Sequence, residues 1–394
     1  MPHGIALLAG LFLAALSLRP QLVGVGPLIP EIQRDLDVSH AVAGLLGTIP
    51  VLCMGVFAPP APHLSRRIGS RAAIAACVGA IGVIGVGRAL APGAAAVIAL
   101  TVPLGIGMGF AGALMPVAVK ERFAHRPAFA TAIYAMGING GSAIASSVAV
   151  PLASWLGTWR WSLGIFSAAT CTLVVGWLAL TRREPPHRRT EVPHVRIPWR
   201  SGTGWRLVLV FGLMGSVFYG LNSWLPDTYV EHGWTKSSAG GLLAALNLAA
   251  LVPPLLVAWF ADRMGSRRLY LSGGCTFLLT GTLGLVLAPG GAWAWATMAG
   301  IATGVCFPLV MTLPVDVGRG PAQTGAIAAM MLGAGYVLSG IAPFALGAIR
   351  DATGSFDAVL WVLFGAAAAM FALCLSLSQT RLGRSGLPEP APVP

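Results

Sequence analysis

Residues 64–71 read LSRRIGSR, and residues 260–267 repeat the pattern as FADRMGSR, 196 positions later. Each copy follows a long apolar segment and carries several basic residues. The same offset places Pro30-Glu31 over Pro226-Asp227. Two separate matches at one offset indicate an internal duplication, so we expect two related halves.

The composition indicates a membrane protein. Of the 394 residues, 56% are hydrophobic and 10% are charged, whereas a soluble domain has about 25% charged residues. The net charge of +12 would suit nucleic acid, but the basic residues lie in short segments between apolar runs. That distribution is typical of membrane topology. We therefore expect membrane lipid around the chain and no nucleic acid partner.

Twelve apolar segments are long enough to cross a bilayer as helices, which takes about 20 residues each. The expected fold class is all-α integral membrane, with twelve transmembrane helices in two pseudo-symmetric six-helix bundles. The expected spans are 4–29, 41–62, 71–90, 94–119, 127–152, 160–180, 204–226, 237–261, 268–288, 292–315, 321–349 and 357–379. The expected divisions are a bundle at 1–180, a basic cytoplasmic linker at 181–203, a bundle at 204–380 and a disordered tail at 381–394.

The distribution of Lys and Arg predicts the orientation. Nineteen of the 25 lie in segments on the same side as both termini, and five lie on the other side, with Arg88 counted among those five. Cytoplasmic segments carry the excess of basic residues. We therefore expect a multi-pass protein of the cell membrane with both termini in the cytoplasm.

Several motifs carry a family resemblance. Asp262–Arg267 reads D-R-x-G-x-R and Arg67–Arg71 reads R-x-G-x-R, and both resemble the cytoplasmic loop motif of the major facilitator superfamily of secondary transporters. Residues 18–20 (LRP), 224–226 (WLP) and 351–355 (DATGS) resemble the cyanate and 2-nitroimidazole permease branch. The resemblance implies the major facilitator fold, with spans one, four, seven and ten around a cavity, and a small-solute carrier that alternates between two facings.

Arg19 stands in the middle of the first apolar segment and is the one charged side chain that the sequence places deep in a span. A cation there costs roughly 2.5 to 3.5 kcal/mol on insertion scales and usually marks a transport pathway. Its fork of donors suits carboxylates and other flat anions. We predict that Arg19 contacts the solute. The alternative is an arginine satisfied by backbone carbonyls freed at Pro20 or Pro27.

Few other polar or aromatic side chains lie within the spans. Tyr219 and Asn222 are three residues apart, so one helical face could present a ring and an amide together. The candidate solute contacts are Arg19, Tyr219, Asn222, Asn139, Tyr134, Asn247, Tyr336 and Phe218. Asparagine in hydrocarbon needs a partner, and the sequence leaves open whether the three asparagines meet the solute or tie helices together.

Charged residues at the expected cytoplasmic ends form a candidate gate. Arg67 with Glu121, and Arg263 with Asp316, occupy related places in the two halves, and Asp262 stands beside Arg263. We hypothesise that these pairs hold the cytoplasmic side shut when the outer side is open. The alternative is a topology signal with exposed pairs worth at most about 1 kcal/mol each.

The favoured function is secondary transport of a small anionic or flat polar solute by rocker-type alternating access. Multidrug-type efflux of small aromatic compounds is the alternative, and a non-transporting membrane sensor is a further one. The efflux alternative draws on apolar residues expected near the cavity: Met108, Phe110, Phe307, Met330 and Met331. Proton coupling through Glu31 or Asp227, facilitated diffusion and exchange remain equally compatible.

Enzymatic function is not expected. The spans and the long linker contain no metal-ligand cluster, no nucleophile with a base and no nucleotide-binding loop. The six cysteines lie singly in apolar runs and are interpreted as small core residues. We expect a monomer that needs no cofactor and whose partner is a small-molecule solute.

Overall fold

A computed structural model describes residues 2–123, 127–182, 197–261, 267–318 and 321–376. Across these ranges the chain is helical, and twelve helices are long and apolar enough to cross a membrane. They coincide with the twelve predicted spans, which confirms the all-α membrane fold. The largest difference is in the first span, which extends over Ile5–Leu36 instead of ending at residue 29.

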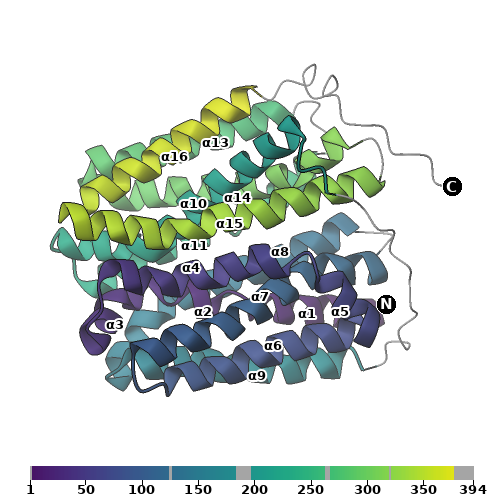
Figure 1. The fold of residues 1–394 in the computed structure, drawn as a ribbon, viewed down its shortest axis with the longest axis horizontal. Helices are drawn as coiled ribbons and strands as arrows, with labels where there is room; N and C mark the ends of the chain where they lie inside the picture. Colours follow the sequence, from purple (N-terminus) through teal and green to yellow (C-terminus); the bar gives the residue numbers. More distant parts are fainter. Residues whose placement is uncertain (1, 124–126, 183–196, 262–266, 319–320, 377–394) are drawn as a thin grey trace.

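The first half of the chain forms one bundle and the second half forms the other (Figure 1). The first bundle contains α1 (Pro2–Leu16), α2 (Pro20–Val23), η1 (Gly26–Leu28), α3 (Ile29–Leu36), α4 (His40–Phe57), α5 (Ala61–Ile68), α6 (Ser70–Ala89), α7 (Ala94–Arg122), α8 (Pro127–Leu156) and α9 (Trp159–Leu180). The second contains α10 (Gly202–Glu231), α11 (Lys236–Ala249), α12 (Pro253–Ala261), α13 (Arg267–Leu287), η2 (Pro289–Gly291), α14 (Ala292–Val317), α15 (Pro321–Thr353) and α16 (Phe356–Ser376).

Local sequence explains where several helices begin. A hydroxyl side chain caps the first turn of four of them, namely Ser39 at α4, Thr158 at α9, Ser201 at α10 and Thr235 at α11. Such caps satisfy backbone N–H groups that have no partner within the helix. Gly157 and Gly233, in two of the preceding links, have φ angles of 76° and 85°, which glycine adopts without a steric penalty.

The two bundles touch along α4 and α15, where glycine lets the backbones approach. A Cβ on Gly55 would stand 2.6 Å from the carbonyl oxygen of Gly333, and one on Gly44 would stand 2.5 Å from that of Pro343. Lipid removes the hydrophobic drive between helices, so small residues at such contacts gain packing energy instead. The α4 and α15 helices therefore form a boundary at which the backbones of the two bundles approach closely.

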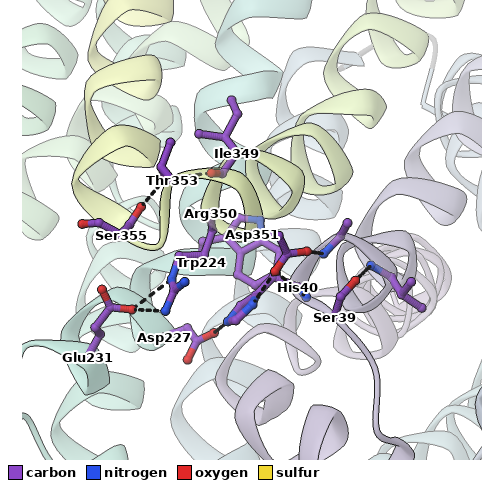
Figure 2. Close-up of polar contacts among 12 residues, drawn as sticks. Ser39, His40, Trp224, Asp227, Glu231, Ile349, Arg350, Asp351, Thr353 and Ser355 are labelled. Atoms are coloured by element: carbon purple, nitrogen blue, oxygen red, sulfur yellow. Dashed lines mark hydrogen bonds and ion pairs between the residues drawn. The ribbon is translucent and has the colours of Figure 1, made fainter.

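Polar contacts join the bundles at one end, which carries the links at residues 37–39, 157–158, 232–235 and 354–355 and is called here the predicted outer end. Asp351 of α15 accepts hydrogen bonds from the backbone N–H groups of His40 (3.2 Å) and Ala41 (2.8 Å) and contacts the His40 ring at 2.8 Å. Figure 2 shows these contacts. Asp351 thus caps the first turn of α4 from the opposite bundle.

Two further contacts strengthen the same end. His40 Nε2 lies 3.7 Å from an oxygen of Asp227 on α10, so the ring stands between two carboxylates of the second bundle. Lys236 of α11 pairs with Glu31 of α3 at 2.8 Å. These groups must separate if the bundles part at the predicted outer end.

Replacing Asp351→Ala is expected to favour molecules open at this end. The change removes the cap of α4, worth about 1 kcal/mol, which shifts the equilibrium by about fivefold. Spin labels on Ser154→Cys and Ser237→Cys, one in each bundle, will report the opening as a longer distance population.

The matched control is Asp357→Ala on α16. Asp357 lies 3.6 Å from His232 of its own bundle, so its loss should leave the distances unchanged. Identical distance distributions for the parent and Asp351→Ala would contradict the proposed role of the cap.

Candidate functional site

The first span is interrupted where Arg19 stands. Helix α1 ends at Leu16 and α2 begins at Pro20, and Arg19 occupies the capping position between them. Pro20 has no N–H to donate to the preceding turn and its ring crowds that turn, which favours a break at this point. The backbone N–H groups of Leu22 and Val23 donate to the Arg19 carbonyl at 3.0 and 2.9 Å. The break therefore fixes Arg19 at a defined place in the span.

Arg19 is buried, with 8% of its surface exposed, and its partner belongs to the other bundle. Its Nη1 donates to the hydroxyl of Tyr219 on α10 at 2.7 Å, and its Cζ lies 5.5 Å from the centre of that ring. Among the described carboxylates, none lies within the 4.0 Å that defines an ion pair with Arg19. The cation thus has a neutral partner and no counter-charge in the described part of the chain.

A cavity opens beside Arg19 between the bundles, with about 700 Å³ of empty space including its mouth. The first bundle contributes Arg19, Ala135, Ile138, Asn139 and Ser142. The second contributes Phe211, Phe218, Tyr219, Thr303, Phe307 and Tyr336, together with small and aliphatic residues near the break between α11 and α12. Among the described residues that line the cavity, Arg19 alone is charged.

Aromatic rings form much of the second bundle's side of the cavity. Phe218 and Tyr219 meet edge to face with centroids 5.3 Å apart, and Phe211 and Tyr336 do so at 4.9 Å. These are the favoured geometries of aromatic pairs. The rings therefore support one another and present fixed faces to the cavity.

A family model described as Major Facilitator Superfamily matches residues 6–343. The chain belongs to the Major Facilitator Superfamily. It is a multi-pass membrane transporter rather than an enzyme.

Two relatives from Escherichia coli (strain K12) are similar over nearly the whole chain. The cyanate transport protein CynX is 30% identical over 349 residues, which cover 88% of this chain and 90% of CynX. The 2-nitroimidazole transporter is 27% identical over 374 residues, covering 94% and 95%. These matches agree with the resemblance that the sequence motifs indicated.

A solved structure has the same fold. It is a bacterial homolog of the human lysosomal transporter Spinster in an inward-facing and occupied conformation. The two chains superpose with a TM-score of 0.69 at 18% identity, covering 98% of each. At this identity the likeness shows the superfamily fold alone.

Five of the eight predicted solute contacts line the cavity: Arg19, Asn139, Phe218, Tyr219 and Tyr336. Asn139 also donates from Nδ2 to the carbonyl of Ala250 at 3.3 Å, where α11 ends. Asn139 therefore ties the bundles together at the edge of the cavity.

The other three predicted contacts do not line this cavity, and their role as solute contacts stays a prediction. Asn247 donates to Asn222 Oδ1 at 3.0 Å, and Asn222 donates to the Phe218 carbonyl at 2.8 Å. These asparagines are buried and satisfy one another, so they join α10 to α11 instead of facing the cavity. Tyr134 packs against the hydrophobic core of the first bundle.

Sequence reasoning missed Phe211, Ser142 and Thr303 as lining residues. A usable signal for Phe211 was present, because residues 211, 215, 218 and 219 recur at helical spacing along one face of α10. Ser142 and Thr303 offered no such signal. Their hydroxyls donate to carbonyls of their own helices, at Ile138 (3.2 Å) and Gly300 (2.9 Å).

Arg88 is a second buried arginine, and it lies in the last turn of α6, at the end of that span. Arg88 ends α6 with 1% of its surface exposed and donates to both the carbonyl (3.0 Å) and the side-chain oxygen (2.8 Å) of Gln21. Gln21 in turn donates to Ser167 at 2.7 Å and to the Leu163 carbonyl at 3.2 Å. Arg88 therefore anchors α2, the short helix that follows Arg19, to α6 and α9.

The predicted gate residues are only partly described. Arg67 is exposed, and Glu121 accepts a hydrogen bond from Ser70 and lies 3.9 Å from Arg122, so the predicted Arg67–Glu121 pair is not formed in the described structure. The reason is that Gly69 separates α5 from α6, which brings Ser70 to the end of α7.

The second predicted pair of the gate is not tested. Asp262 and Arg263 lie outside the described residues, and Asp316 stands in the last turn of α14. The gate hypothesis stays a prediction.

No group of three His, Cys, Asp or Glu side chains among the described residues is arranged to hold a metal ion. Of the six cysteines, Cys275 and Cys374 approach one another with sulfur atoms 3.6 Å apart inside the second bundle.

Substitutions at Gln21 and Arg88 should reveal the buried network. Gln21→Met removes the side-chain acceptor of the buried Arg88 guanidinium and leaves it the backbone carbonyl of residue 21, which costs about 2 to 3 kcal/mol of stability. Adding Arg88→Met removes the unpaired charge, so the double variant should be more stable than Gln21→Met. Thermal unfolding in detergent measures both.

Gln33→Met on α3 serves as the control and should stay within about 0.5 kcal/mol of the parent. A double variant less stable than Gln21→Met would show that the guanidinium is satisfied without Gln21.

Proposed function

We propose that this superfamily member transports a small anionic or flat polar solute by rocker-type alternating access, with Arg19 as its charge contact. The observation that carries the proposal is a buried arginine in a cavity between the bundles, which donates a hydrogen bond to the neutral hydroxyl of Tyr219. An intramembrane cation held in this way usually marks a transport pathway. An anionic solute would supply the missing counter-charge.

The shape of the contact groups supports a flat solute. A guanidinium presents a planar fork of donors to a carboxylate or a similar anion. Tyr219 and Tyr336 add hydroxyl groups and ring faces from the second bundle. The names of the relatives fit both descriptions, because cyanate is a small anion and 2-nitroimidazole is a flat polar ring.

The position of the site supports alternation. The Arg19–Tyr219 hydrogen bond crosses from the first bundle to the second, so relative motion of the bundles alters the site directly. Contacts that close the predicted outer end, such as Lys236–Glu31 and His40–Asp351, also cross the boundary. A solute bound to both bundles can therefore bias which end is open.

The proposal also covers the orientation of the chain in the membrane and the energy source of transport. The basic residues favour cytoplasmic termini in the cell membrane, and the chain is proposed to act as a monomer in lipid. Glu31 and Asp227, which the sequence offered for proton coupling, both stand at the predicted outer end in contact with Lys236 and His40. Proton coupling, facilitated diffusion and exchange are distinguished by uptake into proteoliposomes with and without a pH gradient.

Multidrug-type efflux receives less support from the lining of the cavity. Of the five apolar residues that the alternative draws on, Phe307 lines the cavity. Met108, Met330 and Met331 are buried in the packed cores, with at most 2% of their surface exposed. Lipophilic cations would also meet Arg19, whose charge repels them.

Arg19→Gln is expected to weaken anion binding strongly. The variant keeps polar atoms near Tyr219 but removes the charge, and a charge-assisted contact of this kind is worth about 2 kcal/mol or more, or at least about thirtyfold in affinity. Thermal shift of the purified protein with cyanate, nitrate and benzoate, followed by uptake into proteoliposomes, provides the measurement.

Arg34→Gln is the matched control, because Arg34 is an exposed arginine that donates to the carbonyl of Pro30 on its own helix. It should bind anions as the parent does. If the parent and Arg19→Gln are stabilised equally by these anions, Arg19 is not the charge contact.

A further inference from the structure

The cavity offers its solute one charged contact and few free donors. The amide of Asn139 donates to Ala250, and the hydroxyls of Ser142 and Thr303 donate to their own helices. Arg19 and the neighbouring hydroxyls of Tyr219 and Tyr336 are left as donors among the described lining residues. An inorganic anion bound there would be hydrogen-bonded on one side and would face apolar surface on the others, where its desolvation is poorly offset.

The charge distribution also disfavours a dianion. The other buried arginine, Arg88, is bonded to Gln21 behind α2 and does not line the cavity. A second carboxylate on the solute would therefore lie against apolar side chains without a cation to pair with. Burying an unpaired charge is expensive.

The opposite side of the cavity suits an aromatic body. Phe211 and Phe218 of α10, Phe307 of α14 and Tyr336 of α15 come from three helices of the second bundle. Ring faces stabilise a flat ring through edge-to-face and offset contacts.

We propose that the preferred solutes are monocarboxylates carried on a single aromatic ring, with the carboxylate on Arg19 and the ring against Phe218, Phe307 and Tyr336. This inference rests on the proposed transport function and names the substrate class of the same site. The carboxylate is held by the first bundle and the ring by the second, so one small molecule bridges the two moving parts.

The test measures binding of six probes to the purified full-length protein by calorimetry. Benzoate is compared with acetate and cyanate, which lack the ring, with nitrate, with benzamide, which lacks the charge, and with phthalate, which adds a second carboxylate. Benzoate is expected to bind about 30-fold more tightly than acetate or cyanate because its ring leaves water for apolar surface. Benzamide and phthalate are each expected to bind at least about tenfold more weakly than benzoate.

The outcomes separate this inference from the function it rests on. If cyanate or nitrate binds as tightly as benzoate and Arg19→Gln weakens all binding strongly, the aromatic class is wrong and anion transport stands. If benzamide or phthalate matches benzoate, the requirement for a single charge is wrong. If no anion binds, or Arg19→Gln binds them all, both proposals fail.

Phe307→Leu tests the position of the ring. It should weaken benzoate by about fivefold and leave acetate within about twofold, because acetate has no ring to lose the contact. Phe277→Leu is the control, since Phe277 is 45% exposed on the outer surface of α13. Equal losses for benzoate and acetate in Phe307→Leu would place the ring elsewhere, and the probe series on the parent stands independently of how the variant folds.

Discussion

A guanidinium buried at the depth of a membrane needs hydrogen-bond acceptors or an anion, and Arg19 donates to the Tyr219 hydroxyl at 2.7 Å. The surrounding architecture follows from that need. Pro20 begins α2, so Arg19 stands at a helix end, and its side chain lines the cavity between the bundles. A cation at this depth is tolerated when it faces protein, water or a ligand.

The helix break beside Arg19 would weaken the first span if no other contact held α2 in place. Arg88 supplies the support, because its guanidinium holds both oxygens of Gln21 and thereby fixes the four-residue helix α2 against α6 and α9. One arginine is thus available to a solute, and the other holds the backbone in place. The same residue type serves two roles because Arg88 is bonded on the inside of the first bundle, whereas Arg19 points to its boundary.

The site and the predicted outer end are linked through the boundary between the bundles. Asp351 caps α4 across that boundary. The glycines of α4 and α15 let the two backbones approach closely, with few large side chains between them. Such a contact with a few polar ties can separate at one end while it stays packed at the other. Solute held between Arg19 and the rings of the second bundle would act on the same boundary, in keeping with the alternation typical of the superfamily.

The sequence by itself determined the twelve spans, the duplication, the family and the position of Arg19, because apolar length, repeated motifs and a charge in an apolar run are local properties of the chain. The tertiary structure decided which polar residues share a space. Asn222 lies three residues from Tyr219, yet it bonds to Asn247 instead of facing the cavity. Arg88, which the sequence places on the outer side, donates to Gln21 of α2. The partner of each of these side chains comes from a distant segment of the chain, so the spacing of residues within one helix cannot predict it.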